Sequence, residues 1–103
     1  MDFYDPTDLK RFSEIGKFSE ELMKKFFDYY NAATGEDGAL TKREKALIAL
    51  AVAHVKQCPY CIEIHTQRAK KAGCSEAEIA EAVMGSAALR AGAAATHGTH
   101  RLE

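Results

Sequence analysis

Two capping boxes fix where two helices of this chain begin. In a capping box a Ser or Thr is followed three positions later by Glu or Gln, and each side chain binds the backbone N–H of the other residue. Thr41 with Glu44 and Ser75 with Glu78 both fit this pattern. An apolar or alanine-rich run follows each box, and no alternating strand pattern is present. The sequence therefore predicts an all-α fold.

Proline, glycine and further caps divide the rest of the chain. Pro59 cannot donate a backbone N–H inside a helix but suits a first helical position, so Cys58 is expected to be the N-cap of a new helix. Ser19 should cap an earlier helix with one buried apolar face. We expect helices over about Pro6–Ile15, from Ser19 to the loop at 34–38, from Thr41 to about Gln57, from Cys58 to about Ala72, and from Ser75 to about Ala95, with a frayed tail over 96–103.

Length and composition exclude several classes of protein. A chain of 103 residues forms at most one domain, and its alanine-rich helices suit close packing against another subunit. The net charge of −1 comes from 14 basic and 15 acidic residues without long runs of one sign, so a nucleic-acid partner is not expected. The longest apolar stretch, 46–53, is far below the ~20 residues that span a bilayer, so no membrane partner is expected.

The three cysteines point to redox chemistry in a reducing compartment. No secretory signal precedes them, so we expect a cytoplasmic protein in which a Cys-x-x-Cys pair is catalytic or binds metal. Cys58 and Cys61 would lie on one face at a helix start, where free N–H groups stabilise a thiolate. His65 follows one turn later on the same face and can exchange protons with Cys61. These three residues form the predicted catalytic stripe.

Zinc is the main competing interpretation of this segment. His54, Cys58, Cys61 and His65 are all zinc-ligand types, but on a continuous helix the outer pair would be ~16 Å apart. Four donors within ~2.3 Å of one ion are difficult to gather from such a rod, although a kink at Pro59 relaxes the objection. We therefore expect no metal and no organic cofactor. His54 and Glu44 are added as candidate catalytic residues, His54 because it lies one turn before Cys58.

The residues Leu40–Ala53, the segment Cys58-Pro59-Tyr60-Cys61-Ile62 with His65, and Ala72–Ile79 resemble the carboxymuconolactone decarboxylase family, in particular its AhpD-like alkylhydroperoxidase branch. The resemblance is clearest over residues 40–83, within a single domain that we assign to 1–103. The N-terminal part, with Tyr4-Asp5-Pro6, also resembles the subgroup of arsenosugar biosynthesis-associated peroxidase-like proteins.

The resemblance implies an AhpD-like helical bundle assembled as a homo-oligomer, a trimer or hexamer. It also implies a thiol-dependent peroxidase or disulfide oxidoreductase that acts on a small peroxide or disulfide and is regenerated by a protein or thiol reductant. By analogy Cys61 attacks the peroxide, Cys58 resolves the product and His65 relays protons. The helix-start argument instead favours Cys58 as the more acidic thiol, and the sequence does not decide between the two.

One departure from the family concerns its relay glutamate. That residue usually lies twelve positions before the first cysteine, where this chain has Ala46. Glu44 would point to nearly the opposite side of the helix, because each residue turns it by ~100°. His54 is the candidate replacement. Two other functions stay open: a non-enzymatic, redox-responsive oligomeric module, and a decarboxylase, a branch that generally does not need two thiols.

Overall fold

The computed structural model describes residues 14–102, and every regular element in that range is a helix. After the helical residues 14–16 come four α-helices and one 3₁₀-helix: α2 (Glu20–Gly35), α3 (Lys42–Lys56), α4 (Pro59–Lys71), α5 (Glu76–His97) and η1 (Gly98–Leu102). The all-α prediction is confirmed. Most of the first expected helix, Pro6–Ile15, lies outside the described residues. At its expected end, residues 14–16 are helical.

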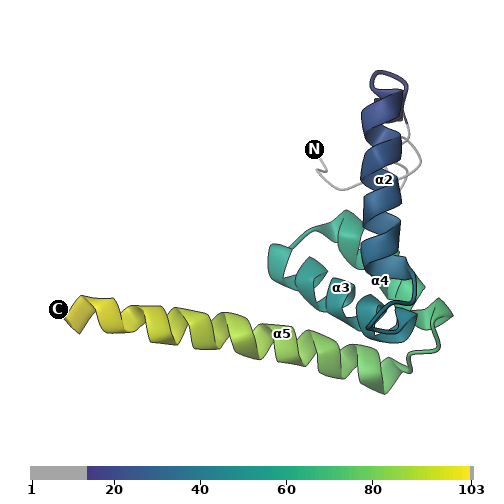
Figure 1. Ribbon diagram of the computed structural model, residues 1–103. Coiled ribbons are helices and arrows are strands. Elements are labelled where there is room, and N and C mark those ends of the chain that lie inside the picture. Colours follow the sequence, from purple (N-terminus) through teal and green to yellow (C-terminus); the bar gives the residue numbers. More distant parts are fainter. Residues whose placement is uncertain (1–13, 103) are drawn as a thin grey trace, which may run out of the picture.

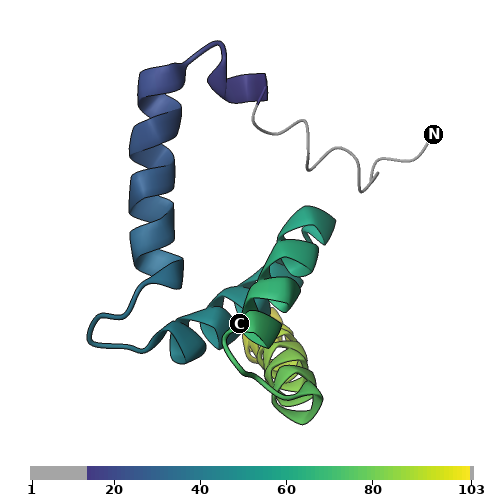
Figure 2. The same ribbon diagram turned by 90° about the vertical axis from the view of Figure 1, so that its right-hand side faces the viewer.

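Helix α3 is the centre of the molecule and contacts α2, α4 and α5. The core is small and consists largely of alanines and short side chains: Ala46, Leu50, Ala69, Cys74 and Ile79, with Leu47, Ala72 and Ala82 packed against them. Leu50 is the largest side chain that is completely buried. Figures 1 and 2 show α2 rising away from this core and α5 extending far beyond it in another direction.

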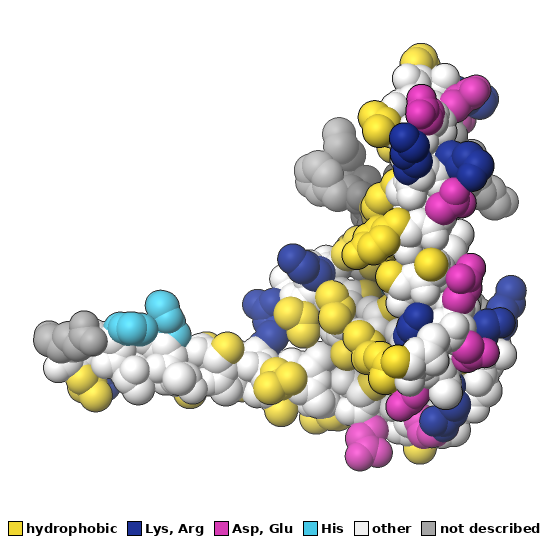
Figure 3. All heavy atoms as spheres, in the orientation of Figure 1, with side chains coloured by type: hydrophobic (Ala, Val, Ile, Leu, Met, Phe, Trp, Pro, Cys, Tyr) yellow, Lys and Arg dark blue, Asp and Glu magenta, His cyan; other side chains and the backbone are white. Residues whose placement is uncertain are grey.

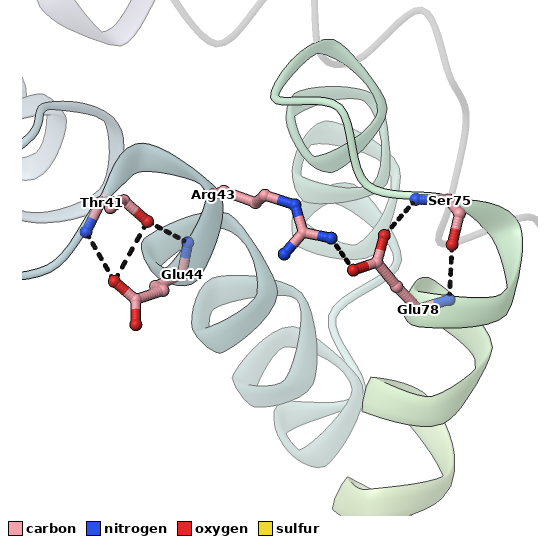
Figure 4. A network of polar contacts seen from close by, with 5 residues as sticks. All are labelled: Thr41, Arg43, Glu44, Ser75 and Glu78. Carbon is pink, nitrogen blue, oxygen red and sulfur yellow. Dashed lines mark hydrogen bonds and ion pairs between the residues drawn. The ribbon is translucent and has the colours of Figure 1, made fainter.

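Both capping boxes form as predicted, and together they join two helices (Figure 4). Thr41 and Glu44 cap α3 through bonds of 2.9 and 3.1 Å, and Ser75 and Glu78 cap α5 through bonds of 2.8 and 3.1 Å. The second oxygen of the Glu78 carboxylate also pairs with Arg43 of α3. The start of α5 is therefore fixed against the start of α3.

The expected buried face of α2 is the clearest error of the sequence analysis. No residue of α2 is buried, and Leu22 and Phe26 are 70% and 47% exposed. The apolar period is present, but α2 projects from the body, and Figure 3 shows hydrophobic side chains uncovered along it. Ser19 does occupy the N-cap, yet its side chain makes no capping hydrogen bond.

The C-terminal segment also differs from its prediction. Helix α5 runs on to His97 and η1 continues to Leu102, so residues 96–102 are helical and not frayed. The reason is local, because the N–H of Gly98 bonds the carbonyls of Ala94 and Thr96 and carries the backbone into the 3₁₀ turn. No helix within residues 14–102 has the length and apolar character needed to cross a membrane.

Candidate functional site

A sharp junction between α3 and α4 presents the two cysteines. Gln57 ends α3 in the left-handed conformation, with φ 55°, and its N–H bonds the carbonyls of Ala53 and His54. Cys58 then takes the predicted N-cap position and Pro59 the first position of α4. Arg90 of α5 supports the junction by donating to the Val55 carbonyl at 2.5 Å.

The two sulfur atoms lie 2.8 Å apart, and both cysteines are free thiols. This separation exceeds the ~2.05 Å of a disulfide bond by less than an ångström, so a small rotation would join them. Cys58 Sγ also accepts the backbone N–H of Cys61 at 3.3 Å, as a capping side chain does. The helix start therefore holds the sulfur of Cys58 against its own N–H groups.

The same contacts shift the pKa values of the two thiols in opposite directions. The pKa of Cys58 is lowered by hydrogen bonds from the Cys61 thiol and from the N–H groups of Cys61 and Tyr60. The pKa of Cys61 is raised to about 11 by burial, by its hydrogen bond to Cys58 and by negative charge on Cys58. The direction agrees with the helix-start argument, which makes Cys58 the more acidic thiol.

His65 is buried one turn beyond Cys61, with 4% of its surface exposed. Its Nε2 lies 2.5 Å from Oη of Tyr30 in α2, and its Nδ1 has no hydrogen-bond partner among the described residues. Burial, and to a lesser degree the charge of Arg68, lower the pKa of His65. The imidazole is therefore held neutral at physiological pH.

A pocket of about 440 Å³ opens between α2, α3 and α4, and Cys61 and His65 both line it. Most of its wall is apolar, from residues such as Leu40, Ile48 and Val52, and Tyr30 adds a hydroxyl. Within residues 14–102, the charged residues in the wall are Lys45 and Lys56. A small, largely apolar molecule can therefore reach Cys61.

The other two candidates from the sequence lie outside this wall. His54 donates from Nδ1 to the Leu50 carbonyl at 2.8 Å, within its own helix. Glu44 is exposed at the start of α3, where its bonds from Thr41 lower its pKa. Ala46, at the family's glutamate position, is buried in the core. Within residues 14–102, no three His, Cys, Asp or Glu side chains are grouped so as to hold a metal ion.

Tyr30 is the site residue that the sequence analysis missed. Its position in the apolar period of α2 marked it as a packing residue, and 35 positions separate it from His65. One signal was available, since a tyrosine on a buried face needs a hydrogen-bond partner for its hydroxyl. The sequence alone could not say which partner.

Comparison with known proteins agrees with this geometry. Residues 20–103 match the family described as the carboxymuconolactone decarboxylase family. The chain is 53% identical over 66 residues to "Uncharacterized protein 4 in cox locus" of Paracoccus denitrificans, and 33% identical over 72 residues to an uncharacterized protein of Cupriavidus necator. These alignments cover 64% and 70% of this chain but only 60% and 63% of the two relatives.

Two solved structures share the fold. An apo carboxymuconolactone decarboxylase family protein from Legionella pneumophila is 37% identical with a TM-score of 0.72, over 79% of this chain and 71% of that one. A protein from Methanobacterium thermoautotrophicum is 34% identical with a TM-score of 0.74, over 81% of this chain and 94% of that one.

Proposed function

We propose that this chain, which belongs to the carboxymuconolactone decarboxylase family, reduces organic hydroperoxides with its Cys58–Cys61 dithiol. The observation that carries the proposal is the 2.8 Å contact between the two sulfur atoms at the start of α4. A thiol oxidised by peroxide there has a second thiol within reach to form a disulfide. The apolar pocket beside Cys61 favours an organic hydroperoxide as the substrate.

The reaction would proceed in two steps. Cys61, deprotonated, attacks the terminal peroxide oxygen, the O–O bond breaks, and the alkoxide leaves as an alcohol after gaining a proton. The product is a sulfenic acid on Cys61. Cys58 Sγ then attacks that sulfur, its own proton leaves with the hydroxyl group as water, and the disulfide forms. A thiol or protein reductant returns the pair to the dithiol.

The pKa directions assign different tasks to the two thiols. Cys61 lines the pocket and so meets the substrate, but its pKa of about 11 means that a base must take its proton. Cys58 has the lowered pKa and is the readier nucleophile for the second step. His65 is the proposed base, because it is neutral and shares the pocket. Supporting proton transfer by His54 or Glu44 stays a prediction.

The test is a thiol count before and after one equivalent of an organic hydroperoxide. The parent should lose two thiols rapidly, and Cys58→Ser should be trapped as a sulfenic acid on Cys61. Cys74→Ser is the matched control, because Cys74 packs in the core and should not affect the rate. Full turnover by Cys61→Ser, or loss no faster than that of an ordinary free thiol, would contradict the proposal.

A redox-responsive oligomer is the second candidate, and uncovered apolar surface favours it. Leu22 and Phe26 of α2 and Met84 and Leu89 of α5 are all substantially exposed in the single chain. A homo-oligomer, such as the trimer or hexamer that the family resemblance implied, would bury these faces. We place the protein in the reducing cytoplasm, which would keep the dithiol reduced. An oligomeric state identical before and after oxidation would count against a redox-controlled assembly.

A further inference from the structure

Tyr30 is held in a fixed place beside His65 by contacts on two helices. Its Oη lies 2.5 Å from His65 Nε2, and the two ring centroids are 5.9 Å apart. The guanidinium of Arg68, in α4, lies 5.7 Å from the centre of the Tyr30 ring. Arg68 also donates to Thr34 Oγ1 at 3.2 Å, which ties α4 to the same turn of α2. The phenol therefore has one defined hydrogen-bond partner.

The phenol also shares a pocket with one of the thiols. Tyr30, Cys61 and His65 line the same pocket. Burial raises the pKa of Tyr30, charge on Cys61 and on Cys58 raises it further, and the charge of Arg68 partly opposes this rise. At neutral pH the phenol is thus protonated, while the lowered pKa keeps His65 neutral. A protonated donor and a neutral acceptor stand side by side.

The groups that could otherwise carry a proton are occupied elsewhere. Position 46, the place of the family's glutamate, is an alanine packed against Leu50 in the core. Among the described residues, no aspartate or glutamate lines the pocket. The Nδ1 proton of His54 is bound by the Leu50 carbonyl.

We infer that Tyr30 passes protons between Cys61 and His65 and so takes the part of the missing glutamate. The inference rests on the proposed peroxidase reaction and adds a residue to it. The Cys61 thiol proton moves to the phenol oxygen, directly or through one pocket water, as the phenol proton moves to His65 Nε2. The products are a thiolate and an imidazolium. After the O–O bond breaks, the same path in reverse returns one proton to the alkoxide.

In each transfer the phenol gains one proton as it loses another, so no phenolate accumulates. This suits a tyrosine whose ionisation is made harder by its surroundings. Since His65 acts on Cys61 through Tyr30, the imidazole must accept at Nε2 and carry its own proton on Nδ1. That nitrogen is the buried one without a partner among the described residues.

The test replaces Tyr30 by Phe, which removes one oxygen and keeps the ring under Arg68. Tyr29→Phe is the matched control, because Tyr29 is 74% exposed on the same helix. Positioned acid–base groups contribute about 10²–10⁴-fold, so we expect Tyr30→Phe to slow sulfenic acid formation at pH 7 by at least roughly tenfold. The loss should shrink at high pH, where hydroxide deprotonates Cys61 directly. Rates within twofold of the parent at every pH would overturn the inference.

A second measurement separates this inference from the proposed function. Alkylation of Cys61 by iodoacetamide, followed in a Cys58→Ser background, reports thiolate formation without any peroxide. If the parent turns over no hydroperoxide, the proposed function fails, yet alkylation still decides the relay. Slower alkylation at pH 7 after Tyr30→Phe supports the relay, and an unchanged rate contradicts it.

A fluorinated tyrosine at position 30 distinguishes proton transfer from packing. It keeps the ring and the hydroxyl but makes the phenol more acidic. We expect the pH profile of Cys61 oxidation, or of its alkylation, to shift in this variant. A profile identical to that of the parent would mean that the hydroxyl only holds the helices together, and the inference would be wrong. This variant also serves if Tyr30→Phe does not fold.

Discussion

Restoring the family's glutamate by Ala46→Glu should strongly destabilise the protein and not improve its chemistry. Ala46 is 4% exposed and packs in the core with Leu50 and Ala69, both fully buried. Overpacking a core costs about 1–3 kcal/mol, and burying a polar group without a partner costs about 2 kcal/mol or more. The loss of about 3–5 kcal/mol is a large part of the 5–15 kcal/mol that stabilises a typical domain.

Chemical denaturation followed by circular dichroism measures this loss, with Ala49→Glu as the matched control. Ala49 lies one turn along the same helix but lines the pocket, so a carboxylate there can reach solvent. We expect Ala49→Glu to unfold within about 1 kcal/mol of the parent. An Ala46→Glu variant as stable as the parent, with faster peroxide reduction, would refute the reasoning, because position 46 would then face the site.

Three further predictions concern stability. Leu50 is the largest fully buried side chain within residues 14–102, and Leu50→Ala would leave a cavity in its place. The free energy of unfolding in urea should fall by about 2.7–5 kcal/mol, and a loss below 1 kcal/mol would mean that the core collapses around the cavity. Ser75→Ala removes a formed cap and should lower the free energy of unfolding by about 1 kcal/mol. Ser19→Ala should lower it by almost nothing, because the Ser19 side chain makes no capping hydrogen bond. Equal losses in the two variants would contradict this prediction. Because the pKa of folded His65 lies below that of the unfolded chain, stability should fall as the pH drops from about 6.5 through the folded pKa, and His65→Gln should flatten that slope in pH-dependent melts.

Local signals in the sequence were sufficient to predict most helix boundaries. The capping boxes at Thr41 and Ser75 gave the starts of α3 and α5, and Pro59 gave the start of α4. Each of these signals acts within one helical turn, so nothing distant can override it easily. The Cys58–Cys61 contact was predictable for the same reason, because residues three apart on a helix start are neighbours.

What depended on distant parts of the chain could not be predicted. The period of α2 indicates an apolar face, but it does not say what covers that face, and little within residues 14–102 does. Tyr30 and His65 meet because the C-terminal half of α2 lies beside α4. Their contact follows from the angle between two helices, and no single-sequence pattern encodes that angle.

The hydrogen bond from Arg90 to the Val55 carbonyl connects the neighbourhood of the dithiol to α5. Val55 lies three residues before Cys58, and Arg90 lies on α5, the helix that extends beyond the core. Closing the disulfide changes the start of α4, where the two cysteines lie. The guanidinium of Arg90 links this region directly to α5, and the link does not involve the buried alanines of the core. The bond between Arg90 and Val55 therefore joins the end of α3, next to the dithiol, to the long C-terminal helix.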